Sequence, residues 1–546
     1  MEPNTQKPSQ RVAISAKLAQ ALQKMDVEFT PDVMRPDSPD HGDWSSNCAM
    51  ALARQMKKAP RMVAEEIIKN LDQTMFEKVE IVGPGFMNFF LKPEVVTKFV
   101  KDACDEGFGR SDFGKGTKVM VEFVSANPTG PVTVANGRGA PLGDSISRLL
   151  EWVGYSVHRE FYVNDRGSKV TNLGRSLEQR YRQARGLDWS MPEEGYPGEY
   201  LLDIAKEMVP DFGNTPFDMP DSERVEFFGR QAVTRMIAWQ EKVFEKFGIK
   251  FDLWFSEAKM AAEGKIEQTL ERLKKTGCIY EAEGATWLRS TDFGDDKDFV
   301  VVKSTGDATY TLGDIAYHIG KFDRGFDLAI DLMGADHHGH VGPMHAGLQA
   351  LGIDHNRLEF VLYQLVHLFR GEVQVKMSKS SGEFVTLEEL LDEVGVDAAR
   401  YFYLMRSSDT HLNFDLDLAK SQTMDNPVYY VQYAHVRCCA IMDDERAKDI
   451  DLSKASPFEH QLEKALAMEL VTFPDEVKAS ALARTPHRIA AYAEKIASAF
   501  HSFYYECHVL NEEPAIKARR MLLVKATRNV LKGCLDILGV SAPNRM

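Results

Sequence analysis

Two segments of the sequence combine residue types that bind phosphate. The first, EFVSANPTGPVTVANGRGAPLGD (122–144), runs from an apolar strand through a Pro/Gly-rich loop into a helix predicted to begin near Asn136. Backbone N–H groups and the positive end of a helix dipole favour an anion at such a turn. The segment is therefore a candidate phosphate or carboxylate site, although the same residues could simply shape a strand-to-helix turn.

The second segment is KMSKSSG (376–382), a lysine pair among small residues. Two ammonium groups and several hydroxyls can donate charge-assisted hydrogen bonds to a polyphosphate whose negative charge develops during displacement. It follows the first segment by about 240 residues, at the end of a region that alternates strands and helices. That placement favours a nucleotide site over a chance match.

A third group of polar side chains is GADHHGH (334–340), followed by His345. Imidazole and carboxylate groups both bind zinc, so a metal site is one interpretation. The other is contact with a substrate at the carboxyl end of a strand, where ligands of open parallel sheets bind.

Composition limits the class of protein that carries these segments. The chain has 546 residues, of which 44% are hydrophobic and 27% charged, as in soluble globular proteins of three or four domains. We find no apolar run near the roughly 20 residues that span a bilayer and no secretory leader. Seven cysteines without a C-x-x-C pair indicate reduced thiols. We expect a cytoplasmic monomer with neither a membrane nor a DNA partner, and the net charge of −15 argues against coating nucleic acid by bulk charge.

The order of strand-like and helical patterns predicts three domains. Residues 1–112 form a small α+β domain whose strands flank Gly83-Pro84-Gly85. Residues 113–385 alternate strands and helices, which indicates an α/β domain with a parallel sheet, interrupted by a helical insertion at about 173–266. Residues 386–546 lose the strand pattern and read as an all-α helical bundle.

One helix near the end of the bundle concentrates positive charge. Two interpretations are open, a solvated helix face and a contact with the RNA backbone. The residues are Lys517, Arg519, Arg520, Lys525, Arg528 and Lys532.

Beyond these segments, the chain resembles class I aminoacyl-tRNA synthetases, and among them the arginyl-tRNA synthetases. The resemblance runs nearly end to end, through HGDWSSNCAMALA, GPGFMNFFL, VEFVSANPTGP, FYVNDRGSK, YTLGDIAYH, GADHHGH, VDAARYFYLMRSSDTHLNFDLDLA, NPVYYVQYAHVR and LGVSAPNRM. It implies a nucleotide-binding core, an N-terminal domain that contacts the tRNA elbow and a C-terminal anticodon-binding domain. It also implies the reaction: ATP, arriving with Mg²⁺, activates L-arginine as an adenylate, and the arginyl group passes to the terminal adenosine of arginine tRNA.

The resemblance also implies roles for individual residues, with no resident metal. The catalytic residues would be Thr133, Asn136, Lys376 and Lys379. The ATP contacts would be Thr133, Ala135, Asn136, Gly137, Asp336, His338, Lys376, Met377, Ser378, Lys379 and Ser380. The arginine contacts would be Glu122, Asn127, Tyr310, Asp314 and His337, and the tRNA contacts Phe86, Asn88, Tyr433 and Met546.

Three of these residues could instead have a purely structural role. Glu122 could be a paired core carboxylate, Asp314 a helix N-cap, and Tyr433 a core tyrosine beside Tyr430. Against them, the permanently charged guanidinium of arginine requires carboxylates and planar acceptors, which Glu122 and Asp314 supply.

The first motif departs from the family pattern. Where the family carries H-I-G-H or a close relative, this chain has Thr133-Val134-Ala135-Asn136. Loss of one such donor costs about 3–4 kcal/mol, or roughly 10²–10³ in rate, but Thr and Asn keep neutral donors, as in the T-I-G-N motif of tryptophanyl-tRNA synthetases. Two hypotheses follow: an active arginyl-tRNA synthetase with a variant motif, or an impaired paralogue that binds tRNA or arginine as a regulatory or carrier module.

Overall fold

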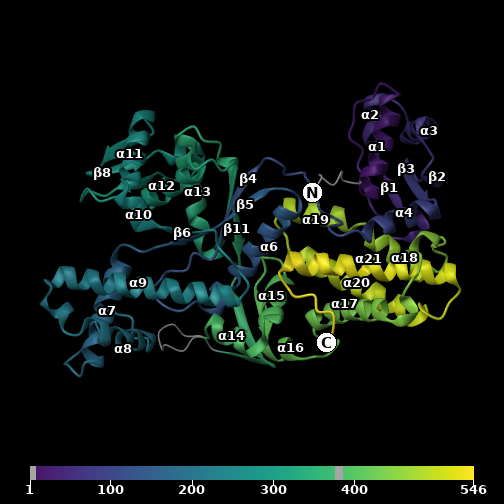
Figure 1. Ribbon diagram of the computed structural model, residues 1–546. Helices are drawn as coiled ribbons and strands as arrows, with labels where there is room; N and C mark the ends of the chain where they lie inside the picture. The colour runs from purple at the N-terminus through teal and green to yellow at the C-terminus, as the bar shows by residue number, and fades with distance from the viewer. Residues whose placement is uncertain (1–7, 376–384) are drawn as a thin grey trace. The chain divides into compact units, whose positions relative to one another are not determined.

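The computed structural model describes residues 8–375 and 385–546, and the chain divides into two compact units. The first comprises Met1–Phe113, Trp152–Gly154 and Gln422–Met546, and the second comprises Gly114–Glu151 and Tyr155–Ser421. Figure 1 labels the elements of both units along the chain. The candidate site residues of the phosphate and arginine pockets belong to the second unit.

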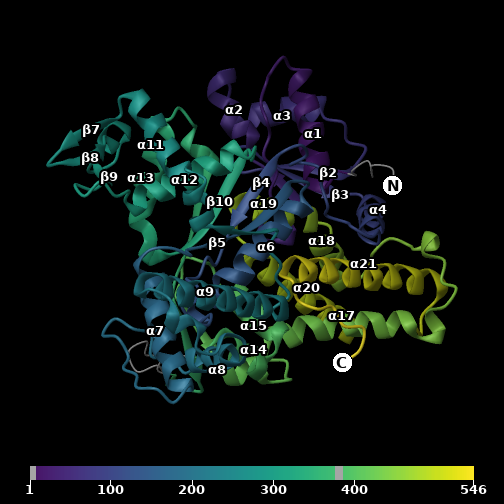
Figure 2. The same ribbon diagram turned by 60° about the vertical axis from the view of Figure 1, so that its left-hand side comes forward.

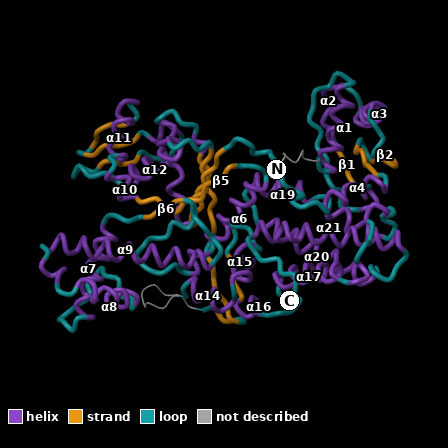
Figure 3. Tube along the Cα trace, in the orientation of Figure 1, coloured by secondary structure: helices purple, strands orange, loops and turns teal. Residues whose placement is uncertain are grey.

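The second unit is built on a five-stranded parallel sheet, drawn in orange near the centre of Figure 3. Its strand order is β11-β10-β4-β5-β6, with every neighbouring pair parallel. The strands are β4 (Lys118–Glu122), β5 (Ser156–Val163), β6 (Leu253–Ser256), β10 (Leu328–Gly334) and β11 (Leu358–Tyr363). The chain builds outward from β4 to β6 on one side and then from β10 to β11 on the other. The strand order therefore reverses between β4 and β10, and ligands of open parallel sheets bind beyond the carboxyl ends of strands at such a reversal.

The sequence of β4 explains its central position. Val119, Met120 and Val121 are all fully buried, as expected for a strand covered on both faces by helices. Helices follow the strands as predicted: α6 (Gly139–Trp152), α12 (Tyr310–Asp323) and α13 (Val341–Ala350). The approach of α6 depends on a glycine, because a Cβ on Gly143 would lie 2.2 Å from the Phe123 ring.

The predicted insertion at 173–266 is only partly an insertion. Helices α7 (Ser168–Ala184), α8 (Tyr200–Phe212) and α9 (Asp221–Lys246) pack on a core of their own that includes Leu173, Leu177 and Phe228, and Figure 2 shows them together. The same stretch contains β6, which pairs with β5 and belongs to the central sheet. A four-residue strand is too short for periodicity to separate it from the surrounding helices.

Two small sheets also depart from the predicted alternation. Within the region predicted to form a parallel sheet, β9 (Phe299–Val302) instead pairs antiparallel with β8 (Ala285–Leu288), which pairs with β7 (Ile279–Ala282). A second small sheet joins β12 (Val366–Arg370) to β13 (Val373–Gln374) and to β14 (Leu412–Asp415).

The end of the second unit differs from the predicted boundary at residue 385. β14 lies beyond it and pairs with β12, and the unit continues to Ser421. The intervening helices are α14 (Leu387–Val394) and α15 (Val396–Leu404), followed after β14 by α16 (Leu416–Lys420). The remaining helices of this unit are α5 (Val134–Gly137), α10 (Glu257–Ala262) and α11 (Lys265–Thr276).

The first unit combines the expected α+β and helical parts. The sheet order β1-β3-β2 is antiparallel, formed by Trp44–Ser46, Phe86–Leu91 and Phe76–Val82. Around it lie α1 (Gln10–Gln23), α2 (Cys48–Met56), α3 (Pro60–Asn70) and α4 (Pro93–Ala103). The C-terminal part consists of α17 (Pro427–Asp443), α18 (Gln461–Leu470), α19 (Phe473–Ala483), α20 (His487–Glu506) and α21 (Pro514–Leu538).

Two of the six basic residues of α21 depart from both interpretations of its charge. Arg519 and Arg520 are neither solvated nor available to RNA, because they are only 4% and 9% exposed. Both guanidinium groups bond Glu463, with Nε–Oε distances of 3.1 and 2.7 Å. Burial disfavours the charge on Glu463, but the hydrogen bond from Arg520 and the charge of Arg519 hold its pKa below the ordinary value.

Among the described residues, none of the helices combines the length and apolarity needed to cross a bilayer.

Candidate active site

Three carboxylates stand in a row across the central strands, level with the carboxyl end of β4. The register pairs Asp331 of β10 with Glu122 of β4, and Glu122 with Glu160 of β5. Residues in register on adjacent strands face the same side of the sheet, so the three side chains are neighbours. Asp331 and Glu160 are 3% and 0% exposed, which would be costly without compensating cations.

Helix α12 supplies the compensating groups. Lys321 is completely buried, and its Nζ donates to Glu122 Oε2 at 2.7 Å and to both Asp331 oxygens at 2.6 Å. Arg324, at the end of the helix, donates to the two Glu160 oxygens at 2.6 and 2.9 Å. Burial opposes ionisation of Glu160, yet hydrogen bonds from His158 and Arg324 and the charges of Arg324 and Lys321 bring its pKa to about 2.

His318 continues this network along the same helix face. Its Nε2 lies 2.7 Å from Asp331 Oδ2 and its Nδ1 lies 2.6 Å from the carbonyl oxygen of Asp314. A carbonyl oxygen only accepts, so Nδ1 carries a proton that it donates to Asp314. Through His318 and Lys321, hydrogen bonds connect Glu122 with the backbone of Asp314.

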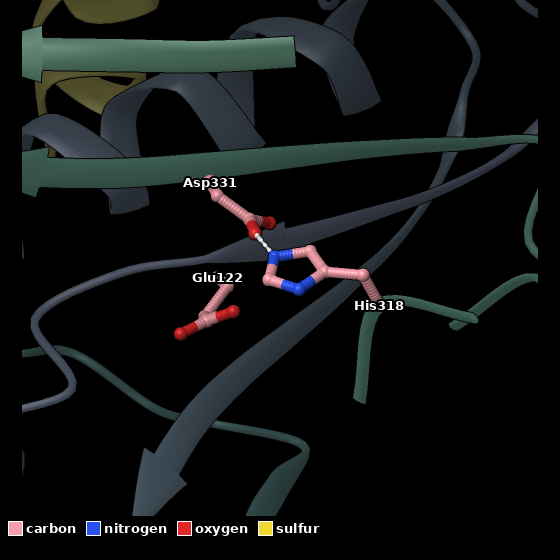
Figure 4. A group of neighbouring side chains, drawn as sticks. All are labelled: Glu122, His318 and Asp331. Carbon is pink, nitrogen blue, oxygen red and sulfur yellow. Dashed lines mark hydrogen bonds and ion pairs between the residues drawn. The ribbon is translucent and has the colours of Figure 1, made fainter. Parts of the chain in front are cut away.

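Glu122, His318 and Asp331 also converge closely enough to hold a metal ion, with their ligand atoms within 4.8 Å of one another (Figure 4). The donor set alone would suit a divalent cation. However, the ammonium of Lys321 already donates to both carboxylates. The convergence is therefore explained by an ion-pair network centred on a lysine.

Asp314 lies in this group without a cation of its own. In the described part of the chain, no salt bridge reaches its carboxylate, and burial raises its pKa to about 6. The nearby charges of Glu257 and Glu122 also raise this pKa, while His318 and Lys321 oppose them. The helix N-cap alternative for Asp314 is wrong, because Thr309 caps α12 and its hydroxyl accepts from the backbone N–H of Leu312.

The loop after β4 holds Glu122 from the other side. The Ser125 hydroxyl donates to Glu122 Oε1 at 2.9 Å and accepts from the backbone N–H of Tyr162 at 3.1 Å. Val124 and Ser125 have φ of 70° and 43°, in the left-handed region that a β-branched residue rarely occupies. Such strain persists where surrounding contacts over-determine the backbone, and it concentrates at functional sites.

The other predicted arginine contacts lie around this network. Asn127 is exposed in the loop after β4, and its carbonyl accepts from Gln240 at 3.3 Å. Tyr310 is the first residue of α12 and is 59% exposed. His337 is exposed in the 3-10 segment Ala335–His340 directly after β10, 3.8 Å from a carboxylate oxygen of Asp336. Hydrogen bonds between the described residues thus connect Glu122 with Asp314, but not these three side chains.

The variant first motif is organised around one short helix. Thr133 caps α5, and its Oγ accepts from the backbone N–H of Asn136 at 3.4 Å. The same hydroxyl donates to Asn136 Oδ1 at 2.8 Å. The two polar residues of the motif are therefore bonded to each other, with Ala135 half-buried between them.

Side chains of α14 and α15 also pack closely against the first motif. Gly137 is buried, and a Cβ there would lie 2.9 Å from Leu387 and 3.0 Å from the Tyr403 hydroxyl. Tyr403 donates to the carbonyl of Val134 at 2.9 Å. The predicted start of the helix near Asn136 is two residues later than the observed start at Val134.

Backbone hydrogen bonds join the first motif to the residues that follow the second. Val134 N donates to the carbonyl of Val385 at 3.2 Å, and Leu387 N donates to the carbonyl of Val132 at 2.8 Å. The predicted contacts Lys376, Met377, Ser378, Lys379 and Ser380 lie outside the described residues, as does the side chain of His338. Their roles remain predictions.

The predicted tRNA contacts have different surroundings. Phe86 is 38% exposed at the start of β3, whereas Asn88 is 4% exposed and its Oδ1 accepts from the Ser45 hydroxyl at 2.8 Å. Tyr433 is half-buried and stacks on Tyr429 at a centroid distance of 6.1 Å, and Met546 is 58% exposed.

Residues of the network that we did not predict are Lys321, His318, Asp331 and Ser125. One signal was available, because Asp314, His318 and Lys321 recur at helical spacing in YTLGDIAYHIGKF and so share a face. What they face could not be read from that segment.

The parallel sheet, its strand-order reversal and the turn after β4 are the features of a nucleotide-binding core such as that of the class I aminoacyl-tRNA synthetases. In agreement, the family described as tRNA synthetases class I (R), catalytic domain, matches residues 104–190 and 222–415. The arginyl tRNA synthetase N terminal domain family matches 12–91, and the DALR anticodon binding domain family matches 431–546.

Whole-chain comparisons agree with these matches. The chain is 45% identical to the arginine–tRNA ligase of Desulforamulus reducens, over 99% of each chain. It is 45% identical to that of Bacillus subtilis, over 94% of this chain and 93% of the other. The solved arginyl-tRNA synthetase of Thermus thermophilus superposes with a TM-score of 0.79 at 23% identity, covering 98% of this chain and all of the other. The chain belongs to the arginyl-tRNA synthetase family.

Proposed function

We propose that this chain joins L-arginine to arginine tRNA through an arginyl-adenylate, using ATP with Mg²⁺ and its variant first motif. Family membership supports the reaction. The observation that carries the choice of amino acid is Asp314, a half-buried carboxylate that no salt bridge reaches among the described residues, beside a row of acids whose own cations are in place.

Arginine supplies the missing positive charge. Its guanidinium stays ionised and matches carboxylates with paired hydrogen bonds. Glu122 and Asp314 are the proposed partners, with Asn127, Tyr310 and His337 completing the pocket. A neutral amino acid would leave Asp314 uncompensated, and a buried unpaired charge is strongly unfavourable.

In the first step, the carboxylate of arginine attacks the α-phosphorus of ATP and displaces pyrophosphate. Asn136 is the proposed donor to the phosphate oxygens. The Thr133 hydroxyl donates to Asn136 Oδ1, so the amide N–H groups of Asn136 can donate to the phosphates. Thr133, Ala135, Gly137, Asp336 and His338 form the rest of the proposed ATP site. From the second motif, the proposed contacts are Lys376, Met377, Ser378, Lys379 and Ser380, with Lys376 and Lys379 countering the charge that develops on the phosphates.

In the second step, a hydroxyl of the terminal adenosine of tRNA attacks the arginyl carbonyl, and AMP leaves. The proposed elbow contact in the N-terminal domain (1–112) is Phe86, because Asn88 is only 4% exposed and its amide oxygen accepts from Ser45, so that Asn88 serves to hold the strand. The proposed anticodon contacts are Tyr433 and Met546 in the helical domain (386–546). The intervening domain (113–385) carries the chemistry. The enzyme is proposed to act as a monomer in the cytoplasm.

The test is aminoacylation of arginine tRNA with labelled arginine. The native chain should charge the tRNA, and Asp314→Asn should raise KM for arginine about 100-fold while KM for ATP changes little. A triple variant, Thr133→His with Ala135→Gly and Asn136→His, measures what the variant motif costs. If the native chain binds tRNA without charging it and only the triple variant is active, the chain is instead the impaired paralogue.

A further inference from the structure

The buried ammonium of Lys321 occupies a position that the adenylation chemistry does not use. It is completely buried, and it touches both Glu122, a proposed arginine contact, and Asp331, the buried carboxylate in register with Glu122 on β10. A buried lysine among apolar neighbours alone would lose its proton readily. Here burial opposes the charge, but the two carboxylates keep the lysine pKa above its ordinary value. The ammonium is thus held as a positive charge between Glu122 and Asp331.

We infer that Lys321 is a positioning residue for arginine recognition, which together with the Ser125 hydroxyl fixes the Glu122 carboxylate in the orientation that receives the guanidinium. The inference rests on the proposed role of Glu122. It assigns Lys321 no contact with arginine.

The geometry around Glu122 carries the inference. One carboxylate oxygen accepts from Lys321 Nζ at 2.7 Å and the other from Ser125 Oγ at 2.9 Å. Two donors from opposite sides, one on α12 and one on the loop after β4, fix the plane of the carboxylate. Each oxygen keeps a further lone pair, and a fork-shaped guanidinium needs both.

The same network sets the position of Asp314. Asp331 accepts from Lys321 and lies 2.7 Å from Nε2 of His318, whose Nδ1 donates to the carbonyl of Asp314 on the preceding turn of α12. Both proposed arginine carboxylates are therefore tied to one buried set of groups. A displacement of about 1 Å in such a set can cost about 100-fold in rate.

Arg324 offers a matched control on the same helix. It compensates Glu160, which is as deeply buried as Asp331 and belongs to the same acidic row. Glu160 has no proposed contact with a substrate. Loss of Arg324 therefore tests what a buried ion pair does for the fold alone.

The experiment compares steady-state aminoacylation by Lys321→Met, Ser125→Ala and Arg324→Met in the full chain. Lys321→Met should raise KM for arginine about 10–100-fold, and Ser125→Ala about threefold to tenfold. In both variants KM for ATP should stay near the native value. Arg324→Met should lower the melting temperature without a selective change in KM for arginine.

Failure of the inference can be told apart from failure of the proposed site. If Glu122→Gln leaves KM for arginine unchanged, the proposed pocket is wrong. If Glu122→Gln raises it but Lys321→Met and Ser125→Ala do not, or if Arg324→Met raises it equally, the positioning role is wrong. Should Lys321→Met not fold, Ser125→Ala, at a partly exposed loop residue, decides the question. In the double variant Glu122→Gln with Ser125→Ala, the effects should be far from additive, because Ser125 acts through Glu122.

Discussion

Asp314 should make arginine use depend on pH in a range where arginine itself does not titrate. Its pKa is raised to about 6, chiefly by burial. The guanidinium requires the ionised carboxylate. With that pKa, about nine-tenths of Asp314 is ionised at pH 7 and about one-tenth at pH 5. We therefore expect kcat/KM for arginine to be flat above about pH 7 and to fall about tenfold between pH 7 and pH 5.

The same residue has an opposite effect on stability. Between its unfolded pKa near 4 and its folded pKa near 6, the folded chain binds more protons than the unfolded chain, so stability falls as pH rises through this window. Ionising Asp314 in the folded protein then costs about 3 kcal/mol above pH 6. Asp314→Asn should consequently raise the free energy of unfolding by up to about 3 kcal/mol at pH 7.5 and by little at pH 4.

The assay is initial-rate aminoacylation at limiting arginine from pH 5 to pH 8, with kcat/KM for ATP followed in parallel. Urea unfolding of the native chain and Asp314→Asn at pH 4 and pH 7.5 gives the stability difference. A tenfold fall that persists in the residual activity of Asp314→Asn, or an equal fall in kcat/KM for ATP, would refute the assignment to Asp314. So would an Asp314→Asn variant that is less stable than the native chain at pH 7.5.

Three further outcomes are expected. Asn136→Asp keeps the size of the side chain but exchanges its N–H donors for a negative charge, so kcat should fall about 10²–10³-fold with KM for arginine unchanged; a kcat within threefold of native would show that Asn136 does not face the phosphates. Arg400→Met removes a completely buried partner of Asp144 and should cost about 3–5 kcal/mol in urea unfolding, with less than 1 kcal/mol contradicting it. Glu463→Gln should destabilise the helical domain by a similar amount at pH 7. Because the pKa of Glu463 is lowered in the folded state, that deficit should shrink only as the pH falls below about 4, and a deficit that shrinks near pH 6 would contradict the ion-pair explanation.

Local pattern and motif were enough to predict much of the second unit. The apolar run at β4, the turn at 125–133 and the helix beyond it follow from residue types within about 25 positions. The alternation of strands and helices predicted the parallel sheet, whereas Glu122 became a candidate through the resemblance to a known family. β6 and β14 were missed because each has four residues and draws its stability from neighbours distant in sequence.

The burial of charged residues could not be predicted from the sequence. Lys321 lies in GKFDR, a segment that would suit an exposed helix end, and only the register of β4 against β10 puts two carboxylates beneath it. Arg519 and Arg520 were read as exposed because their partner Glu463 is more than 50 residues away. A charged residue can be buried because the tertiary fold brings a residue of opposite charge beside it. A single sequence does not show which distant residues are brought together.

The three acids that pair with α12 also fix the position of that helix relative to the strands. Asp331, Glu122 and Glu160 are spaced by the sheet, at about 4.8 Å from strand to strand, while Lys321 and Arg324 are spaced by the helix. Lys321 and Arg324, three positions apart on the chain, both reach their acids in the observed position of the helix. Sliding α12 by one turn, about 5.4 Å, would move each cation out of contact with its acid. Lys321 and Asp314 lie about 10 Å apart along the helix axis. Fixing the position of Lys321 therefore also fixes the position of Asp314. Asp314, the carboxylate proposed to bind arginine, is thus placed by ion pairs at the far end of its own helix. Inserting or deleting one residue between positions 314 and 321 should therefore abolish arginine selection even where the fold survives.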